Sequence, residues 1–277
     1  VPSAVAPVAE PRTGAVSNTF DQAQRGAVEA ETGPVIVVAG PGSGKTRTLT
    51  QRIAYLIRQR GVSSDQMLAV TFTKRAAAEM LSRLRELLSI AQVGALRIGT
   101  FHRLALDLMR LYEAGPPKTV LDALEARHLL DVALHETGLK LRPQAVQQAI
   151  SLAKAAGLRP ADLVGQDKLQ TAYTAYQEQL QACQACDYDD ILLDCLTWLD
   201  TNGETAAQVR QHFPYVLVDE FQDVNAVQYR LVKLLAGDGQ GLFVIGDPDQ
   251  AIYGFRGADA QYFQALTQEF PQARLVQ

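Results

Sequence analysis

The sequence contains few of the residues that build cross-linked or membrane-spanning proteins. Three cysteines occur among 277 residues, and no apolar run approaches the roughly 20 residues that cross a bilayer. Cys183 and Cys186 have the spacing of half a zinc site, but no second Cys or His pair accompanies them. Residues 1–18 are rich in Pro, Ala and Val, without the basic start of a signal peptide, so we expect a flexible leader. These features predict a cytoplasmic protein with reduced thiols and no membrane partner.

The chain also lacks an overall positive charge, because its formal net charge is −4. That value hides a segregation along the chain. Residues 45–118 carry 13 Lys or Arg against 5 Asp or Glu, whereas residues 187–223 carry 1 Arg against 9 Asp or Glu. A basic block beside an acidic one is consistent with a polyanion track next to a metal-associated site. Solvated helix faces would give a milder version of the same contrast.

The most informative segment is a glycine-rich turn that follows the apolar run Val35–Val38 and precedes a helical pattern. It consists of Ala39, Gly40, Pro41, Gly42, Ser43, Gly44, Lys45 and Thr46. Glycines let backbone N–H groups converge on an anion, and the following helix adds its positive end. Lys45 then reaches the β- and γ-phosphates of a nucleotide, and Thr46 offers a hydroxyl to Mg²⁺. A chance turn before a surface helix is the alternative, which the flanking strand and helix patterns disfavour.

Short apolar runs and helical patterns alternate along the chain. The runs that predict buried strands are Val35–Val38, Leu68–Phe72, Leu96–Gly99, Tyr215–Val218 and Leu242–Ile245. Helical patterns at residues 45–60 and 74–89 follow the first two, which predicts an α/β fold with a parallel sheet and helices on both faces. Residues 103–185 have almost no strand signal and show amphipathic helical spacing, so we expect an all-helical insertion domain.

Two further strand ends carry chemistry. Asp219 can hold Mg²⁺ and Glu220 can orient and deprotonate a water. After the last apolar run, Gln250 can hydrogen-bond a γ-phosphate or the attacking water, and Arg256 can neutralise charge that develops during transfer. The aromatic residues of the same loop suit stacking on unpaired bases or, equally, burial in the core. They are Tyr253 and Phe255.

The ordered series of motifs resembles the UvrD/Rep/PcrA-like superfamily 1 DNA helicases. The segments that carry the resemblance are Phe20–Val28, the glycine-rich turn, Thr71–Met80, Gly99–His102, Asp187–Leu192, Asp219–Asp223 and Gly246–Ala258. This chain has Lys74-Arg75 where the family usually has Asn-Lys, and Arg103 where Ser is common. Its Asp187-Tyr188-Asp189-Asp190-Ile191 stands where the family has Asp-Phe-Asp-Asp-Leu.

The resemblance implies a RecA-like P-loop domain 1A, formed by residues 19–102 and 187–277, with the helical domain 1B inserted at residues 103–186. It implies ATP and Mg²⁺ as cofactors, with Gln24 contacting the adenine base. It further implies ATP-driven 3′→5′ movement on single-stranded DNA, unwinding at single-strand/duplex junctions, and a role in DNA repair. The candidate DNA-binding residues are Phe72, Thr100, His102, Tyr253 and Phe255. Family members continue into a second RecA-like half (domains 2A and 2B), so we expect a fragment.

Two alternatives remain open at this stage. The chain could be a natural stand-alone ATP-binding adaptor or regulatory module without motor activity. It could also be another P-loop enzyme, such as a kinase or GTPase, although those classes do not require Gln222 or the loop from Gln250 to Arg256.

Overall fold

A computed structural model describes residues 20–31, 33–250 and 261–277. The expected leader at residues 1–18 lies outside this range. One sheet forms the centre of the fold, and all of its recorded pairings are parallel. In spatial order its strands are β3 (Arg97–Thr100), β2 (Met67–Thr71), β6 (Tyr215–Val218), β7 (Leu242–Gly246), β1 (Val35–Val38) and β8 (Arg274–Val276).

The predicted α/β fold with a RecA-like parallel sheet is confirmed. The five expected strands occur with bounds within one residue of those predicted. The sixth, β8, was not predicted, because its three residues begin with an arginine and give too short an apolar run. It pairs with β1 at the edge of the sheet.

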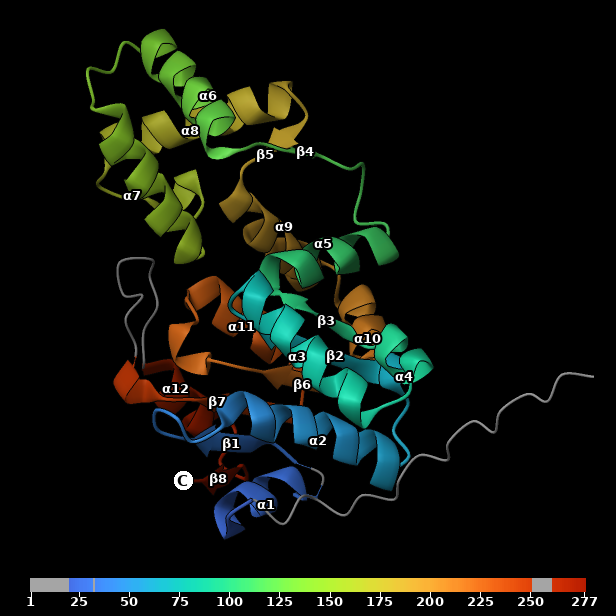
Figure 1. The fold of residues 1–277 in the computed structure, drawn as a ribbon. Helices are drawn as coiled ribbons and strands as arrows, with labels where there is room; N and C mark the ends of the chain where they lie inside the picture. The colour runs from blue at the N-terminus through green and yellow to red at the C-terminus, as the bar shows by residue number, and fades with distance from the viewer. Residues whose placement is uncertain (1–19, 32, 251–260) are drawn as a thin grey trace, which may run out of the picture.

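Helices cover both faces of the sheet (Figure 1). On one face lie α1 (Gln22–Val28), α2 (Lys45–Gln59), α3 (Lys74–Leu87) and α4 (Ile90–Ala95). On the other lie α5 (Phe101–Leu111), α9 (Tyr188–Thr201), α10 (Gly203–His212), α11 (Ala226–Ala236) and α12 (Gln261–Glu269). The two predicted helices at residues 45–60 and 74–89 correspond to α2 and α3.

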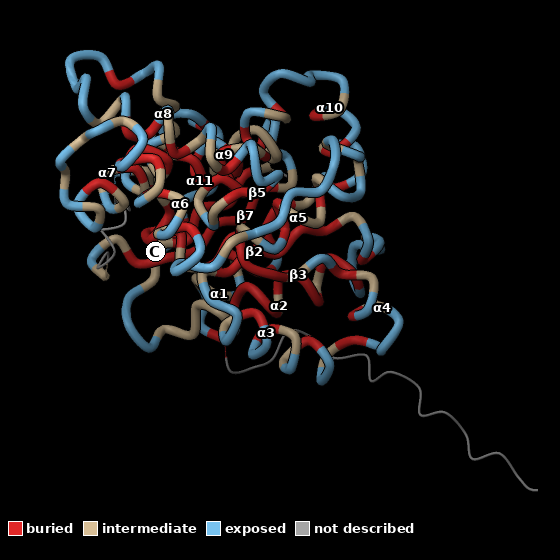
Figure 2. The backbone as a smooth tube through the Cα atoms, turned by 90° about the horizontal axis from the view of Figure 1, so that it is seen from above, coloured by how far each residue is buried: buried red, intermediate tan, exposed pale blue. Residues whose placement is uncertain are grey.

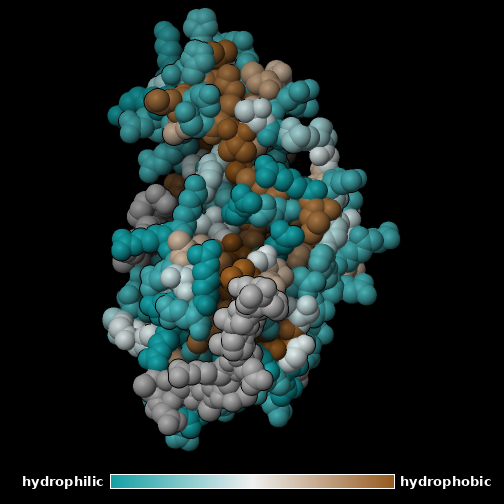
Figure 3. All heavy atoms as spheres, turned by 45° about the vertical axis from the view of Figure 1, so that its right-hand side comes forward, coloured by the Kyte–Doolittle hydropathy of each residue, from teal (hydrophilic) through white to brown (hydrophobic). Residues whose placement is uncertain are grey.

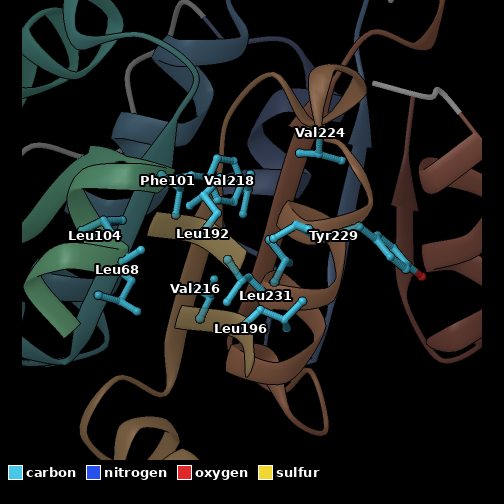
Figure 4. Packing of buried hydrophobic residues seen from close by; sticks show 14 of the residues in the cluster. Leu68, Phe101, Leu104, Leu192, Leu196, Val216, Val218, Val224, Tyr229 and Leu231 are labelled. Carbon is cyan, nitrogen blue, oxygen red and sulfur yellow. The ribbon is translucent and has the colours of Figure 1, made fainter. Parts of the chain in front are cut away.

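Alternation along each strand explains why the sheet needs two helical layers. Val35 and Val37 of β1 pack with the first layer, whereas Ile36 packs with the second. Successive strand side chains point to opposite faces, so a wholly apolar strand must be covered on both sides. Figure 4 shows part of the second layer, in which Leu192 and Leu196 of α9 pack near Val216 and Val218 of β6. The buried backbone accordingly runs through the middle of the molecule in Figure 2, with exposed segments around it.

A separate set of helices stands over the second layer in Figure 1. It comprises α6 (Ala123–Glu136), α7 (Pro143–Ala155) and α8 (Asp167–Ala182), which share a hydrophobic cluster of their own. The chain enters and leaves this part through two short parallel strands, β4 (Thr119–Val120) and β5 (Ala185–Cys186). The sequence did not predict this ladder, because two residues are too short to give a strand pattern.

Short 3-10 turns complete the structure, at η1 (Ser64–Gln66), η2 (Pro160–Asp162), η3 (Phe221–Asp223) and η4 (Pro248–Gln250). Within the described ranges, no helix has the length and apolar character needed to span a bilayer. On the face shown in Figure 3 the surface is largely hydrophilic, with apolar side chains gathered in a narrow band.

Candidate nucleotide site and adjoining cleft

The strand order places three functional loops side by side. β6, β7 and β1 are consecutive neighbours in the sheet, and all three are parallel. Their carboxyl ends therefore meet at one edge, where ligands of such sheets bind. The backbone N–H of Ala39 donates to the carbonyl of Gly246 at 2.9 Å, which joins the glycine-rich turn to the end of β7.

The glycine-rich turn has the backbone that an anion cradle requires. Gly42 and Gly44 have φ values of 70° and 80°, which L side chains rarely adopt. A Cβ atom added at Gly40 or Gly42 would meet nothing within 4 Å, so the backbone here faces open space. α2 begins at Lys45, and its first N–H groups point towards this space. These features fit a nucleotide phosphate group.

Gln24 lies against this turn. Its side-chain amide donates to the carbonyl of Ser43 at 2.6 Å, and its Oε1 accepts from the backbone N–H of Asp21 at 3.2 Å. The second bond closes the capping box at the start of α1. Gln24 therefore ties α1 to the phosphate loop, and its predicted contact with adenine stays a prediction.

Thr46 and Asp219 come together across 173 positions of sequence. The Thr46 hydroxyl donates to Asp219 Oδ2 at 2.9 Å, and Asp219 is only 2 % exposed. Burial, followed by the charge of Glu220, raises the pKa of Asp219 to about 6, against the opposing hydrogen bond from Thr46. A buried carboxylate beside a hydroxyl suits Mg²⁺, which is held by few protein oxygens plus phosphates and water. Within the part of the chain that the structure describes, no three His, Cys, Asp or Glu side chains form a complete metal cage.

Gln222 connects the other carboxylates at this edge. Its buried amide group donates to Glu220 Oε2 at 2.8 Å, and its Oε1 accepts from the backbone N–H of Asp247 at 2.9 Å. Gln250 in turn donates to the carboxylate of Asp247. Glu220 has a φ of 52°, which directs the chain sharply away from the strand. The sequence-predicted Glu220 and Gln250 are therefore joined through Gln222 and Asp247.

Next to this edge, a cleft of about 630 Å³ lies between the core helices and the inserted helices. The predicted DNA-binding residues Phe72 and His102 line it. Thr100 does not. Its side chain is 8 % exposed, and its hydroxyl accepts from the backbone N–H of Arg103 at the start of α5.

An aromatic pair forms one wall of the cleft. The rings of His102 and Tyr188 are stacked, with centroids 3.8 Å apart and planes at 17°, and Tyr188 is 52 % exposed. Burial lowers the pKa of His102 to about 4, so its imidazole is neutral near pH 7. Sequence reasoning quoted Tyr188 only as part of a motif and missed its place in the cleft. An aromatic residue between acidic residues at a helix start is the signal that could have revealed it.

The charged side chains that line the cleft are acidic. Among the described residues that line it, four are aspartates and none is Lys or Arg. One of them, Asp223, has a buried oxygen, Oδ1, without a hydrogen-bond partner. Burial, followed by the charge of Glu220, raises the pKa of Asp223 to about 6. Three further predicted site residues, Tyr253, Phe255 and Arg256, lie outside the described residues.

The parallel sheet and the glycine-rich loop at its carboxyl edge define a RecA-like P-loop domain. A family model for the UvrD/REP helicase N-terminal domain matches residues 20–271. The chain therefore belongs to this family, as the motifs indicated.

Individual relatives agree with the family match. The chain is 36% identical over 274 residues to an ATP-dependent DNA helicase PcrA of Leuconostoc citreum, a match that covers 94% of this chain and 37% of that protein. It is 35% and 34% identical over 275 residues to proteins of the same description from Staphylococcus aureus and Staphylococcus epidermidis, matches that cover 95% of this chain and 38% of each relative. The chain thus spans less than two-fifths of the length of these relatives.

Proposed function

We propose that this chain is the ATP-binding and single-stranded-DNA-binding part of an ATP-dependent DNA helicase. The observation that carries the proposal is the contact of Thr46 with Asp219 at 2.9 Å, beside a cleft lined by Phe72 and His102. It brings together the two halves of an NTP–Mg²⁺ site next to a surface for unpaired bases. The names of the relatives support the same activity.

At the nucleotide site, each residue has a separate task. Lys45 and backbone N–H groups of the glycine-rich turn hold the phosphates, and Thr46 with Asp219 would hold Mg²⁺. Mg²⁺ supplies charge neutralisation for phosphoryl transfer. Glu220 orients and deprotonates the attacking water, and Gln250 senses the γ-phosphate. By sequence position, Arg256 stabilises the charge that develops.

In the cleft, bases and not phosphates face the wall. The lining has acidic side chains and, among the described residues, no Lys or Arg, which disfavours phosphates there, while His102 and Tyr188 offer ring faces. Lys74 and Arg75, exposed at the start of α3, are placed to contact the phosphates outside. Phe72 adds a third ring, and Tyr253 and Phe255 extend the stacking surface by sequence position.

The wider assignment rests on the family resemblance. In this assignment residues 19–102 and 187–277 form domain 1A and residues 103–186 form domain 1B, although α5 at the start of the second range packs on the sheet. A second RecA-like half would close over ATP, and opening and closing would move the strand in the 3′→5′ direction. Single-strand/duplex junctions, DNA repair and a cytoplasmic location belong to the same proposal.

The phosphate site is tested by substituting Lys45→Ala and measuring two affinities separately. We expect at least a tenfold loss of affinity for a fluorescent ATP analogue with Mg²⁺, because the substitution removes the lysine ammonium that binds the phosphates. Affinity for labelled single-stranded DNA, measured by anisotropy, should stay within twofold of wild type. Lys168→Ala removes an exposed charge from α8 and serves as the matched control. Wild-type ATP affinity in Lys45→Ala would refute the assignment.

A further inference from the structure

Lys154 of α7 is a charged residue in an unusual place. Its side chain is 0% exposed, and its Nζ lies 2.6 Å from Asp187 Oδ2 and 2.8 Å from Asp190 Oδ1. Lysine is almost never fully buried unless it is paired. Burial would raise the pKa of Asp187, but the charge and hydrogen bond of Lys154 hold it below its ordinary value. Helix α7 is therefore joined to the start of α9 by a buried ionic contact.

The surrounding side chains leave this ammonium and its partners little freedom. Nζ lies 5.6 Å from the ring centroid of Tyr173 and 5.2 Å from that of Tyr176. The Tyr176 hydroxyl donates to Asp187 Oδ2 at 3.0 Å, and Gln177 donates to Asp190 Oδ1 at 3.1 Å. Tyr173, Tyr176 and Gln177 all belong to the inserted helix α8. They add hydrogen bonds and cation–π contacts, which a buried charge needs.

The carboxylates also shape the backbone at this point. Asp187 caps α9 by accepting from the N–H of Asp190 at 2.9 Å, and Asp190 accepts in return from the N–H of Asp187 at 3.2 Å. Ser151 of α7 donates to Asp189 Oδ2 at 2.6 Å. Three of the four residues from 187 to 190 are thus held by inserted helices. The fourth, Tyr188, points into the cleft and stacks on His102.

We propose that Lys154 is a positioning residue for the nucleic-acid cleft. By fixing Asp187 and Asp190 it sets the start of α9, and so it holds Tyr188 in its stack with His102. The inference rests on the proposed function for the use of the cleft, but the positioning itself does not depend on DNA. A buried pair of this kind tolerates little displacement, because movement of α7 on α9 would leave charges without partners.

Two further ion pairs reach α9 at Asp194, six positions beyond Tyr188 in the sequence. Lys118 and Arg159 both pair with Asp194, at 2.7 Å and 2.9 Å, and their side chains are partly exposed. Exposed pairs contribute little and adapt easily. They join segments next to the inserted helices to α9.

The test substitutes Lys154→Met, which removes the charge and shortens the unbranched side chain by one atom. Two quantities are measured on the folded chain: the shift of the His102 ring protons by NMR, and the affinity for single-stranded DNA. Stacking on Tyr188 displaces those ring resonances in wild type. We expect this displacement to be lost and the dissociation constant for DNA to rise at least fivefold. The exposed control Lys168→Met should leave both unchanged.

A second variant separates positioning from folding. Lys154→Met together with Asp187→Asn and Asp190→Asn removes all three charges of this contact, and Asn still caps a helix. We expect it to fold and to show the same loss of the His102 displacement. A wild-type shift or a wild-type DNA affinity in either folded variant would overturn the proposal. Loss of the α/β fold in the neutral variant would overturn it too, by showing that the network serves folding. Failure of wild type to bind DNA would instead refute the proposed function, while the NMR shift would still test the positioning.

Discussion

At the scale of single residues, the nucleotide edge contains a carboxyl group, Asp219, whose ionised form is destabilised by its surroundings. Asp219 is buried next to Glu220, and its neighbour on the other side is a neutral hydroxyl. A carboxylate in such a place costs stability when it ionises. Binding of a cation would relieve that cost. Asp219 therefore lowers the stability of the unliganded chain and favours binding of a cation.

We predict that Asp219→Asn stabilises the unliganded chain at neutral and alkaline pH. The pKa of Asp219 is about 6 in the folded chain, against an ordinary value of 3.8 for an aspartate. The folded state therefore binds more protons between these values, so wild-type stability falls as pH rises from about 4 to about 6. The difference corresponds to about 3 kcal/mol at pH 8 and about half of that at pH 5.

Urea unfolding at the two pH values measures this difference. The same variant should lose the Mg²⁺ dependence of ATP-analogue binding, since the ion loses its carboxylate. A stability gain of equal size at pH 5 and pH 8 would show that Asp219 does not titrate in this range.

At the scale of elements, close approach of the strand ends sets the site. Gly246 ends β7 directly beside the turn after β6. A Cβ atom placed there would lie 2.9 Å from the backbone nitrogen of Phe221 and 2.8 Å from Cζ of Phe263, and would also press on Gln222. Only a glycine lets β7 end so close to this turn. The connection from Glu220 through Gln222 to Asp247 depends on that approach.

Gly246→Ala should therefore destabilise the chain by about 1–3 kcal/mol, as overpacking of a rigid site does. Nucleotide affinity should fall as well, because the displaced turn carries Asp219 and Glu220. Thermal unfolding and ATP-analogue binding measure the two effects. Gly94→Ala in the exposed part of α4 is the matched control, since its Cβ would meet nothing within 4 Å. That change should be neutral or stabilising, by up to about 1 kcal/mol. Equal stability of both variants would refute the packing argument.

At the scale of the whole molecule, two hydrophobic cores lie on either side of one sheet, and a third belongs to the inserted helices. The nucleotide edge opens to solvent at the glycine-rich turn. In the proposed helicase, groups from a second RecA-like half complete that edge. The chain itself spans 37% to 38% of the curated relatives it matches.

We expect the chain on its own to bind ATP weakly and to hydrolyse it far more slowly than a complete helicase. The reason is that in the proposed helicase ATP lies between two RecA-like halves, so this chain supplies only part of the contacts to the nucleotide. A coupled ATPase assay with and without single-stranded DNA measures this. Hydrolysis at helicase-like rates with stimulation by DNA would contradict the expectation.

Much of the fold could be predicted from short sequence patterns, namely apolar strands, helical spacing and a glycine-rich turn. The turn from Ala39 to Thr46 is contiguous, and its glycines and flanking patterns act over a few residues. Asp219 and Glu220 were likewise marked by the apolar strand before them. The three-residue strand β8 and the two-residue ladder of β4 and β5 were not predicted, because such short elements are set by their partners and not by their own sequence.

The sequence by itself determined which residues could meet a nucleotide, because phosphate recognition depends on a local backbone shape and on a helix that starts at Lys45. Only the tertiary structure decided which residues distant in the sequence meet one another. The contacts of Thr46 with Asp219, His102 with Tyr188, and Lys154 with Asp187 each join separate elements. Their geometry follows from strand order and helix packing, and these arise from the burial of apolar surface by the whole chain.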